Sequence, residues 1–158
     1  MDEVRTRGIS VRDAGEVLTL QRAAYATEAQ IYADPFFPAL TQSLDELENE
    51  LRSGGGLVAM LGERIVAAVR WTVHGDTVHI GRLTVAPDQQ GKGLGTRLLR
   101  QAEDAAGATN AELFTGHLSA ANIRLYLREG YVETRRESLH DGVELVYLAK
   151  RLDARRVG

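Results

Sequence analysis

Three glycines at alternate positions, Gly91, Gly93 and Gly95, are the residues whose type and spacing first indicate chemistry. They lie in the stretch PDQQGKGLG (87–95), between a segment that reads as a β-strand and one that reads as an α-helix. A helix N-terminus offers unpaired backbone N–H groups and a partial positive charge, and glycines let a phosphate approach that backbone closely. The turn therefore predicts an anionic, phosphorylated ligand, with a tight glycine-rich connection as the alternative interpretation.

Two common phosphate-binding motifs do not fit this turn. A Walker A loop needs Ser or Thr after its lysine, whereas Lys92 is followed by Gly93, and no glycine lies five positions before Gly91. A dinucleotide fingerprint needs the spacing G-x-G-x-x-G, which would require glycine at Thr96 or at Leu98. Both mismatches argue against a nucleotide-binding protein, which stays open as a rival interpretation.

The hydrophobic pattern predicts the elements that must position this turn. Alternating or short apolar runs predict strands at 4–9, 57–61, 64–73, 77–86 and 112–115, and a hairpin over 131–148 that turns at Asp141 and Gly142. Helical spacing predicts a first helix, capped by Asp13 and ending at about Tyr25. A short acidic helix should follow, with Leu44, Leu47 and Leu51 toward the core. Two further helices are predicted over 93–106 and 119–129. The segment 27–43 has no clean period over most of its length, so we expect an irregular excursion with at most short helical turns.

A third pattern does fit the turn. The residues QGKGLG (90–95) follow the form Q/R-x-x-G-x-G/A, which resembles the acetyl-CoA-binding segment of the GNAT N-acetyltransferase superfamily. The later stretch NIRLYLREGY (122–131) resembles the same superfamily's N-x-x-x-Y-x-K-x-G-F segment, with Arg128 in the place of Lys and Tyr131 in the place of Phe. Two such motifs in the expected order are far more specific than either alone.

The resemblance implies a fold and a domain organisation. It predicts an α/β (α+β) GNAT-like fold, with a central mixed, mostly antiparallel sheet of six to seven strands flanked by about four helices. The length of 158 residues fits one domain. We expect a single N-acetyltransferase domain over 1–158, with its core at about 4–151 and a tail at 152–158.

The resemblance also implies acetyl-CoA as the acyl donor. The backbone N–H groups of the turn would surround the pyrophosphate of coenzyme A, and a strand before the turn would pair with the pantetheine arm. The cofactor-binding residues expected on this basis are Leu83, Thr84, Val85, Gln90, Gly91, Lys92, Gly93, Leu94, Gly95, Thr96, Asn122 and Tyr126.

For catalysis, the resemblance implies direct attack of an amine on the acetyl group in a ternary complex, and the absence of cysteine is consistent with it. Tyr126, at the motif's tyrosine position, would be the general acid that protonates the coenzyme A thiolate; the alternative is a core tyrosine bonded to a backbone carbonyl. Many relatives use a glutamate as base on the strand before the turn, but 77–86 contains no carboxylate. His79 is therefore our first candidate for the base and His117 our second, because imidazole titrates in the required range.

The acceptor pocket is expected largely from the segment 27–43, since loops on a fixed scaffold usually set specificity. Glu28 and Asp34 could pair with a cationic amine, and Tyr32 and Phe36, with Phe37, could form apolar walls. The expected partner is a small-molecule amine or a peptide amine. A polyamine, an amino acid, an aminoglycoside and a protein N-terminus all stay open, as does an acyl chain longer than acetyl.

The composition excludes several other classes of protein. A net charge of −3 and a pI near 5.8 argue against nucleic-acid binding, and no apolar run is long enough to span a membrane. With no cysteine and four scattered histidines, we expect neither disulfides nor a metal site, and a cytoplasmic location. A homodimer is compatible with the sequence, and an acyl-CoA-binding regulatory module without turnover is the alternative function.

Overall fold

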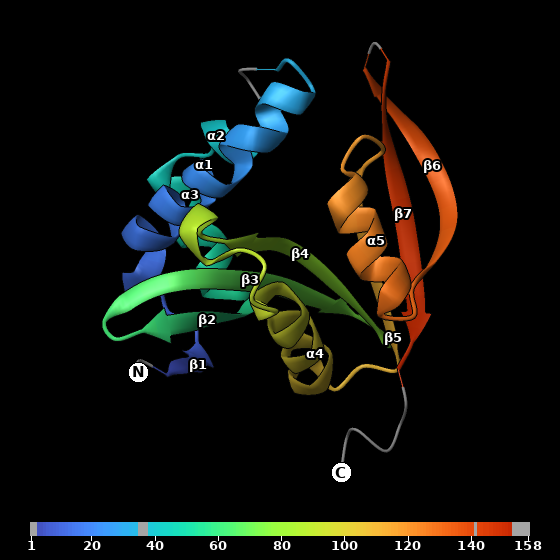
Figure 1. Ribbon diagram of the computed structural model, residues 1–158. Helices are drawn as coiled ribbons and strands as arrows, with labels where there is room; N and C mark the ends of the chain where they lie inside the picture. Colours follow the sequence, from blue (N-terminus) through green and yellow to red (C-terminus); the bar gives the residue numbers. More distant parts are fainter. Residues whose placement is uncertain (1–2, 35–37, 141, 153–158) are drawn as a thin grey trace.

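The computed structural model describes residues 3–34, 38–140 and 142–152, and one seven-stranded sheet runs through them in the order β1-β2-β3-β4-β5-β7-β6 (Figure 1). The strands are β1 (Val4–Gly8), β2 (Gly55–Leu61), β3 (Arg64–His74), β4 (Thr77–Val85), β5 (Asn110–Gly116), β6 (Val132–His140) and β7 (Val143–Arg151). All neighbouring strands are antiparallel except β4 and β5, which are parallel. The predicted mixed, mostly antiparallel sheet is confirmed.

Five α-helices accompany the sheet in the described part of the chain. They are α1 (Ala14–Ile31), α2 (Pro38–Thr41), α3 (Leu44–Ser53), α4 (Leu94–Ala106) and α5 (Ala120–Arg128), with 3-10 turns η1 (Val11–Asp13) and η2 (Pro87–Gln89). Every residue of β3 from Ile65 to Arg70 is buried, so this strand is covered on both faces. Both α1 and α4 pack against β3, and the fully buried Leu98 and Leu99 of α4 join the core.

The parallel pair β4–β5 is short, and this decides the shape of the molecule. Its register covers only Thr77 to His79 on β4 and Asn110 to Glu112 on β5. Beyond that point β4 stays paired with β3, and β5 stays paired with β7. Figure 1 shows the two halves of the sheet, β1–β4 and β5–β7, meeting there and diverging. Among the residues that the structure describes, the edge of β4 that faces β5 therefore has no strand partner from Ile80 onward.

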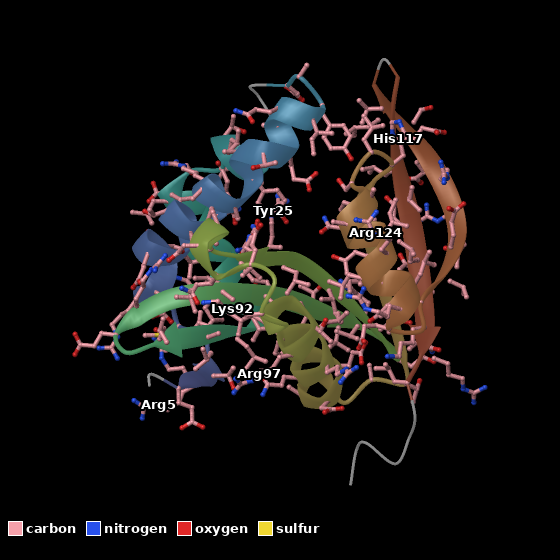
Figure 2. All side chains as sticks on the ribbon, viewed as in Figure 1. Arg5, Tyr25, Lys92, Arg97, His117 and Arg124 are labelled. Carbon is pink, nitrogen blue, oxygen red and sulfur yellow. The ribbon has the colours of Figure 1, made fainter. Side chains whose placement is uncertain are left out.

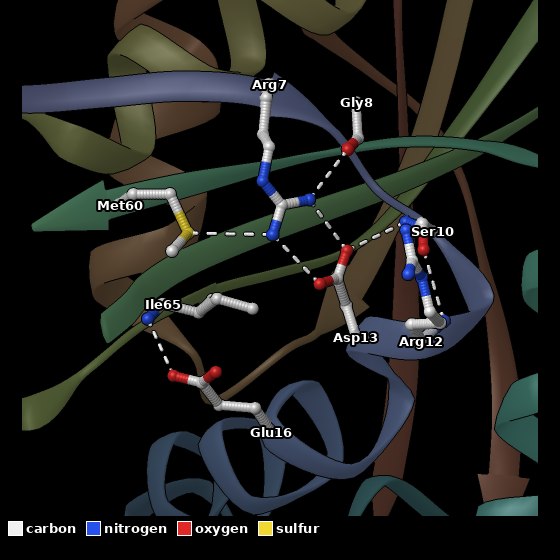
Figure 3. A network of polar contacts seen from close by, with 8 residues as sticks. All are labelled: Arg7, Gly8, Ser10, Arg12, Asp13, Glu16, Met60 and Ile65. Atoms are coloured by element: carbon white, nitrogen blue, oxygen red, sulfur yellow. Dashed lines mark hydrogen bonds and ion pairs between the residues drawn. The ribbon is translucent and has the colours of Figure 1, made fainter. Parts of the chain in front are cut away.

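Asp13 stands at the N-cap of α1 as predicted, but its side chain makes no capping hydrogen bond to that helix. Ser10 caps the preceding turn η1, and its backbone N–H donates to Asp13 Oδ2 at 2.8 Å. The Asp13 carboxylate also accepts two hydrogen bonds from Arg7 at 2.8 and 2.9 Å, which lower its pKa below the ordinary value (Figure 3). Nearby, Glu16 of α1 accepts from the Ile65 N–H at 2.7 Å and so ties the helix to β3.

The segment 27–43 is more helical than predicted. Residues 27–31 extend α1, and Pro38–Thr41 forms the short α2; Phe36 and Phe37 lie outside the described residues. In α3, Leu47 and Leu51 are buried as predicted, but Leu44 is 44% exposed. Ser43 forms a capping box with Glu46, so Leu44 is the first residue of the helix and lies in the turn that faces solvent.

The C-terminal hairpin of β6 and β7 is confirmed, although Asp141 in its turn lies outside the described residues. Leu152, the first residue of the predicted tail, is buried, and its N–H donates to the Thr109 carbonyl at 2.8 Å. Within the described ranges, no helix is both long and apolar enough to cross a membrane.

Candidate active site

The glycine turn joins β4 to α4 with an open backbone. Gly91 has φ 79° and Gly93 φ 81°, a left-handed conformation that favours glycine. A Cβ built on either residue would meet no atom within 4 Å, so the conformation and not close packing requires glycine here. Gly93 is the N-cap of α4 and no side chain caps the helix, which leaves the first N–H groups of α4 for a ligand.

Gly95 lies in the first turn of α4, between the two halves of the molecule. A Cβ there would lie 3.7 Å from Leu125 of α5 and 3.9 Å from Leu83 and Val85 of β4. The beginning of α4 therefore lies beside both β4 and α5. The predicted ligand residues Leu94 and Thr96 belong to the same helical turn, but Leu94 is buried in the core and offers only its backbone.

Polar side chains of the turn are directed partly to neighbouring residues. Gln90 donates to the Val85 carbonyl at 3.3 Å, and Lys92 donates to Gln89 at 3.1 Å. Lys92 is exposed beside the turn, whereas Arg97 donates to the carbonyl of Val4 in β1 at 3.1 Å (Figure 2). Lys92 is thus better placed than Arg97 to lie beside a phosphate at this turn.

A cavity of about 540 Å³ lies where β4 and β5 diverge. Its walls come from α1, the ends of α3, the middle of β3, the unpaired part of β4, β5, α5 and the β6–β7 hairpin. Of the residues predicted to bind or transform ligands, those in its lining are Glu28, Tyr32, Asp34, His79, Leu83, Asn122 and Tyr126. Residues far apart in the sequence are therefore brought to one site.

Tyr126 is the buried tyrosine of this cavity, with 7% of its surface exposed. Burial raises its pKa above the ordinary value, so the hydroxyl keeps its proton. Its hydroxyl forms no hydrogen bond with any residue that the structure describes. The hydroxyl oxygen is also not fully buried. The hydroxyl is therefore accessible from the cavity, and the alternative of a bond to a backbone carbonyl is not what the structure shows.

Asn122 lies one helical turn before Tyr126 on α5 and also lines the cavity. Its amide donates to Thr115 of β5 at 3.4 Å, a long contact that links the helix to the strand. On the opposite wall, Leu83 lines the cavity, whereas Thr84 is buried and donates to the Ala68 carbonyl at 3.4 Å. Val85, half-buried, closes β4 just before the turn.

The two candidate histidines lie in different surroundings. His79 is the last β4 residue paired with β5; it lines the cavity, and its Nδ1 lies 3.8 Å from Glu112 Oε1. His117 does not belong to the cavity lining, and its Nδ1 accepts a hydrogen bond from the Glu144 backbone N–H at 3.0 Å. That bond occupies one ring nitrogen with the hairpin backbone, so His79 is the better placed of the two.

A hydrogen-bonded bridge joins the end of α1 to the start of α5. Ser119 donates to Glu28 Oε2 at 2.6 Å and lies 2.7 Å from the Tyr32 hydroxyl, which also accepts from the Leu118 N–H at 3.0 Å. Tyr32 lies so close to Gly116 that a Cβ there would overlap its hydroxyl. These contacts fix Glu28 and Tyr32 in the cavity wall; Asp34 also lines it, and Phe36 lies outside the described residues.

The cavity lining also contains residues that were not predicted from the sequence, among them Tyr25, Arg70 and Arg82. Arg70 interrupts the apolar run of β3, a signal that could have marked it, since buried arginines are rare. Arg82 has φ 51°, at a point where β4 contains an extra residue relative to β3. A glycine with positive φ often marks a bulge in the sequence, but here the residue with positive φ is Arg82 and not the adjacent Gly81. The bulge could therefore not be predicted from the sequence.

No cluster of three or more His, Asp or Glu side chains that could hold a metal ion occurs in the ranges 3–34, 38–140 and 142–152. The site as described is therefore built from an uncapped helix terminus, an unpaired strand edge and a cavity with titratable side chains.

Comparisons with known proteins agree with this arrangement. The model of the Acetyltransferase (GNAT) family matches residues 25–131. The uncharacterized N-acetyltransferase YjcF of Bacillus subtilis (strain 168) is 27% identical over 132 residues, which cover 83% of this chain and 91% of that protein.

Solved structures share the fold at low sequence identity. The PaiA N-acetyltransferase from Thermoplasma acidophilum, in complex with coenzyme A, has a TM-score of 0.77 and 17% identity, with 95% of this chain and 99% of that chain covered. The yncA protein from Salmonella typhimurium, with its cofactor acetyl-CoA, has a TM-score of 0.74 and 18% identity, with 96% and 95% covered. Since the family model covers more than half of the sequence, the chain belongs to the GNAT family of acetyltransferases and is an acyltransferase.

Proposed function

We propose that this protein transfers an acetyl group from acetyl-CoA to a primary amine, by direct attack of the amine while both substrates are bound. The observation that carries the proposal is the Tyr126 hydroxyl, which is protonated, accessible from the cavity and without a hydrogen-bond partner among the described residues. It lies in the same cavity as Leu83, on the strand that leads to the glycine turn.

The residues present fit acetyl-CoA. The open backbone at Gly91 and Gly93, followed by the uncapped start of α4, provides N–H donors for a pyrophosphate. The unpaired edge of β4 offers backbone groups to the amides of a pantetheine arm, as one strand does to another. Two structures of the same fold that hold coenzyme A or acetyl-CoA support the proposal.

When bound, acetyl-CoA supplies an activated acetyl group, whose carbon bonds to the amine nitrogen as its bond to sulfur breaks. Tyr126 donates its proton to the departing sulfur, because its hydroxyl is still protonated at neutral pH. A free backbone N–H of β4 near the bulge polarises the acetyl carbonyl. His79 accepts the amine proton, directly or through water, and its Nδ1 lies 3.8 Å from the Glu112 carboxylate.

The test is the release of free thiol from acetyl-CoA with a panel of amines, comparing Tyr126→Phe with Tyr131→Phe. The two rings lie 6.0 Å apart, but the Tyr131 hydroxyl donates to Glu103 at 2.7 Å and does not line the cavity. We expect Y126F to lower kcat about 100-fold with an unchanged Kd for acetyl-CoA, and Y131F to keep kcat. A wild-type protein that binds acetyl-CoA without turnover of any amine, or equal rates for Y126F and wild type, would contradict the roles proposed here.

A further inference from the structure

Two arginines line the cavity, and the proton transfers described above use neither of them. Arg70 lies in the middle of β3, opposite Gly81 of β4, and Arg82 follows Gly81 at the bulge. The two charges are close enough that Arg82 helps to lower the pKa of Arg70, for which burial is the main cause. Two guanidinium groups therefore lie close together at this end of the cavity.

Arg70 is held in place by three side chains from α1, α3 and the segment between them. It donates to Gln21 at 3.1 Å and to Gln42 at 3.5 Å, and it pairs with Glu50 at 3.1 Å. Gln42 in turn donates to Glu50 at 2.6 Å, which fixes the carboxylate beside the arginine. The charge of Arg70 is therefore largely compensated by the protein itself.

The charge of Arg82 is not compensated in this way. No carboxylate within residues 3–34, 38–140 and 142–152 forms an ion pair with it. Its guanidinium lies 6.0 Å from the centre of the Tyr25 ring, also in the cavity wall. The Tyr25 hydroxyl is also a hydrogen-bond partner of this guanidinium. A guanidinium has five N–H donors, so others remain for a carboxylate, which it binds in a planar, bidentate geometry.

The cavity wall also carries a carboxylate, Glu28, which lies near both Tyr25 and Tyr126. Burial is the main cause of the raised pKa of both tyrosines, and Glu28 adds to it, whereas Arg82 and Arg70 act on Tyr25 in the lowering direction. The carboxylate of Glu28 is anchored by Ser119 and stays in the wall beside Tyr126. The cavity thus has a carboxylate on α1 near the proposed general acid, and on β4 a guanidinium that no described carboxylate pairs with.

We propose that the acceptor is an amine that also carries a carboxylate, such as an α-amino acid, with its carboxylate bound by Arg82 and its amine near Glu28 and Tyr126. The inference rests on the proposed acetyl transfer and names the class of its acceptor. A cavity of about 540 Å³ is in the size range of small-molecule sites, which favours a free amino acid over a protein surface.

The experiment measures kcat and KM for the α-amino acids, each compared with its carboxamide and with its decarboxylated amine. Arg82→Gln removes the charge, and Arg82→Lys restores the charge without the bidentate geometry. Arg12→Gln is the matched control, because Arg12 is exposed in the turn before α1 and does not line the cavity (Figure 3). Calorimetric titration of each variant with acetyl-CoA, and with the amino acids in the presence of coenzyme A, accompanies the kinetics.

We expect at least one amino acid to be preferred over its two analogues by about 10- to 100-fold in kcat/KM, with R82Q abolishing that preference through KM. R82K should recover part of it, and R12Q should match the wild type. The proposal is overturned if the uncharged analogues react equally well, if R82Q impairs all amines alike or weakens acetyl-CoA binding, or if acetyl-CoA binds but no carboxylate-bearing amine binds or reacts. Failure of acetyl-CoA itself to bind would instead reject the proposed function.

Discussion

Tyr126 and Tyr131 belong to one motif, but their hydroxyls have different surroundings. Both are buried, yet the Tyr131 hydroxyl donates to Glu103, whereas the Tyr126 hydroxyl opens to the cavity. The sequence motif predicted Tyr126 at the site, and the structure places it in the cavity wall. The arginines could not be predicted in the same way, because their position depends on the bulge in β4 and on side chains of α1 and α3.

The raised pKa of Tyr126 has a consequence for the dependence of rate on pH. A general acid must hold its proton, and burial keeps this proton bound above the ordinary tyrosine pKa of about 10. We therefore expect kcat/KM to rise with pH as the amine loses its proton, and to show no fall due to Tyr126 below about pH 10. A pH profile of the wild type measures this. A fall centred near pH 9 that Y126F removes would contradict it.

Among the elements, α4 offers a way to test whether the glycine turn binds a ligand, because glycines lie at both of its ends. Gly93 and Gly107 flank this helix, both with positive φ (81° and 67°), and a Cβ on either would meet no atom within 4 Å. Gly93→Ala and Gly107→Ala should each destabilise the protein by about 1–2 kcal/mol, because alanine is strained in that conformation.

Only Gly93 lies at the N-terminus of α4, where the pyrophosphate is expected. We therefore predict that G93A also weakens acetyl-CoA binding by about tenfold, whereas G107A leaves it unchanged. Thermal unfolding and calorimetry separate the two effects. Equal affinity in both variants would show that the turn does not contact the cofactor.

A buried carboxylate, Glu103, holds α4 to the C-terminal half of the sheet. Glu103 is buried, accepts from Tyr131 at 2.7 Å and pairs with Lys150 of β7 at 3.1 Å. Glu103→Gln leaves the largely buried ammonium without its counterion, so we expect a loss of about 3 kcal/mol in the free energy of unfolding. Glu133→Gln, in an exposed pair with Arg136, should cost less than about 1 kcal/mol. Denaturant unfolding measures both, and similar losses in the two variants would contradict this role of Glu103.

The order of strands and helices could largely be predicted, because each element carries its own periodicity and turn residues. The C-terminal end of α1 could not be predicted in this way. Residues 27–31 are held as helix partly by tertiary contacts such as the Glu28–Ser119 hydrogen bond, which local sequence does not encode. The role of the Asp13 side chain could not be predicted for a similar reason: Asp13 stands at the N-cap of α1, but its carboxylate bonds with Ser10 and with Arg7 of the preceding strand.

For the whole molecule, the decisive feature is the divergence of β4 and β5. It exposes one edge of β4, places the start of α4 beside that edge, and leaves a cavity at the point where the two halves of the sheet meet. The sequence predicts both strands, but the length of their pairing depends on how the two halves pack. The arrangement of the strands in the sheet was expected from the resemblance to the GNAT superfamily, because periodicity and turn residues alone do not determine it.

We expect the glycine turn and the unpaired edge of β4 to bind acetyl-CoA. Calorimetric titration of the folded protein, free of copurified coenzyme A, with acetyl-CoA, ATP and NAD tests it most directly. We predict binding of acetyl-CoA with a Kd on the order of micromolar and no comparable binding of ATP or NAD. Absence of acetyl-CoA binding, or equal binding of the two nucleotides, would contradict the account.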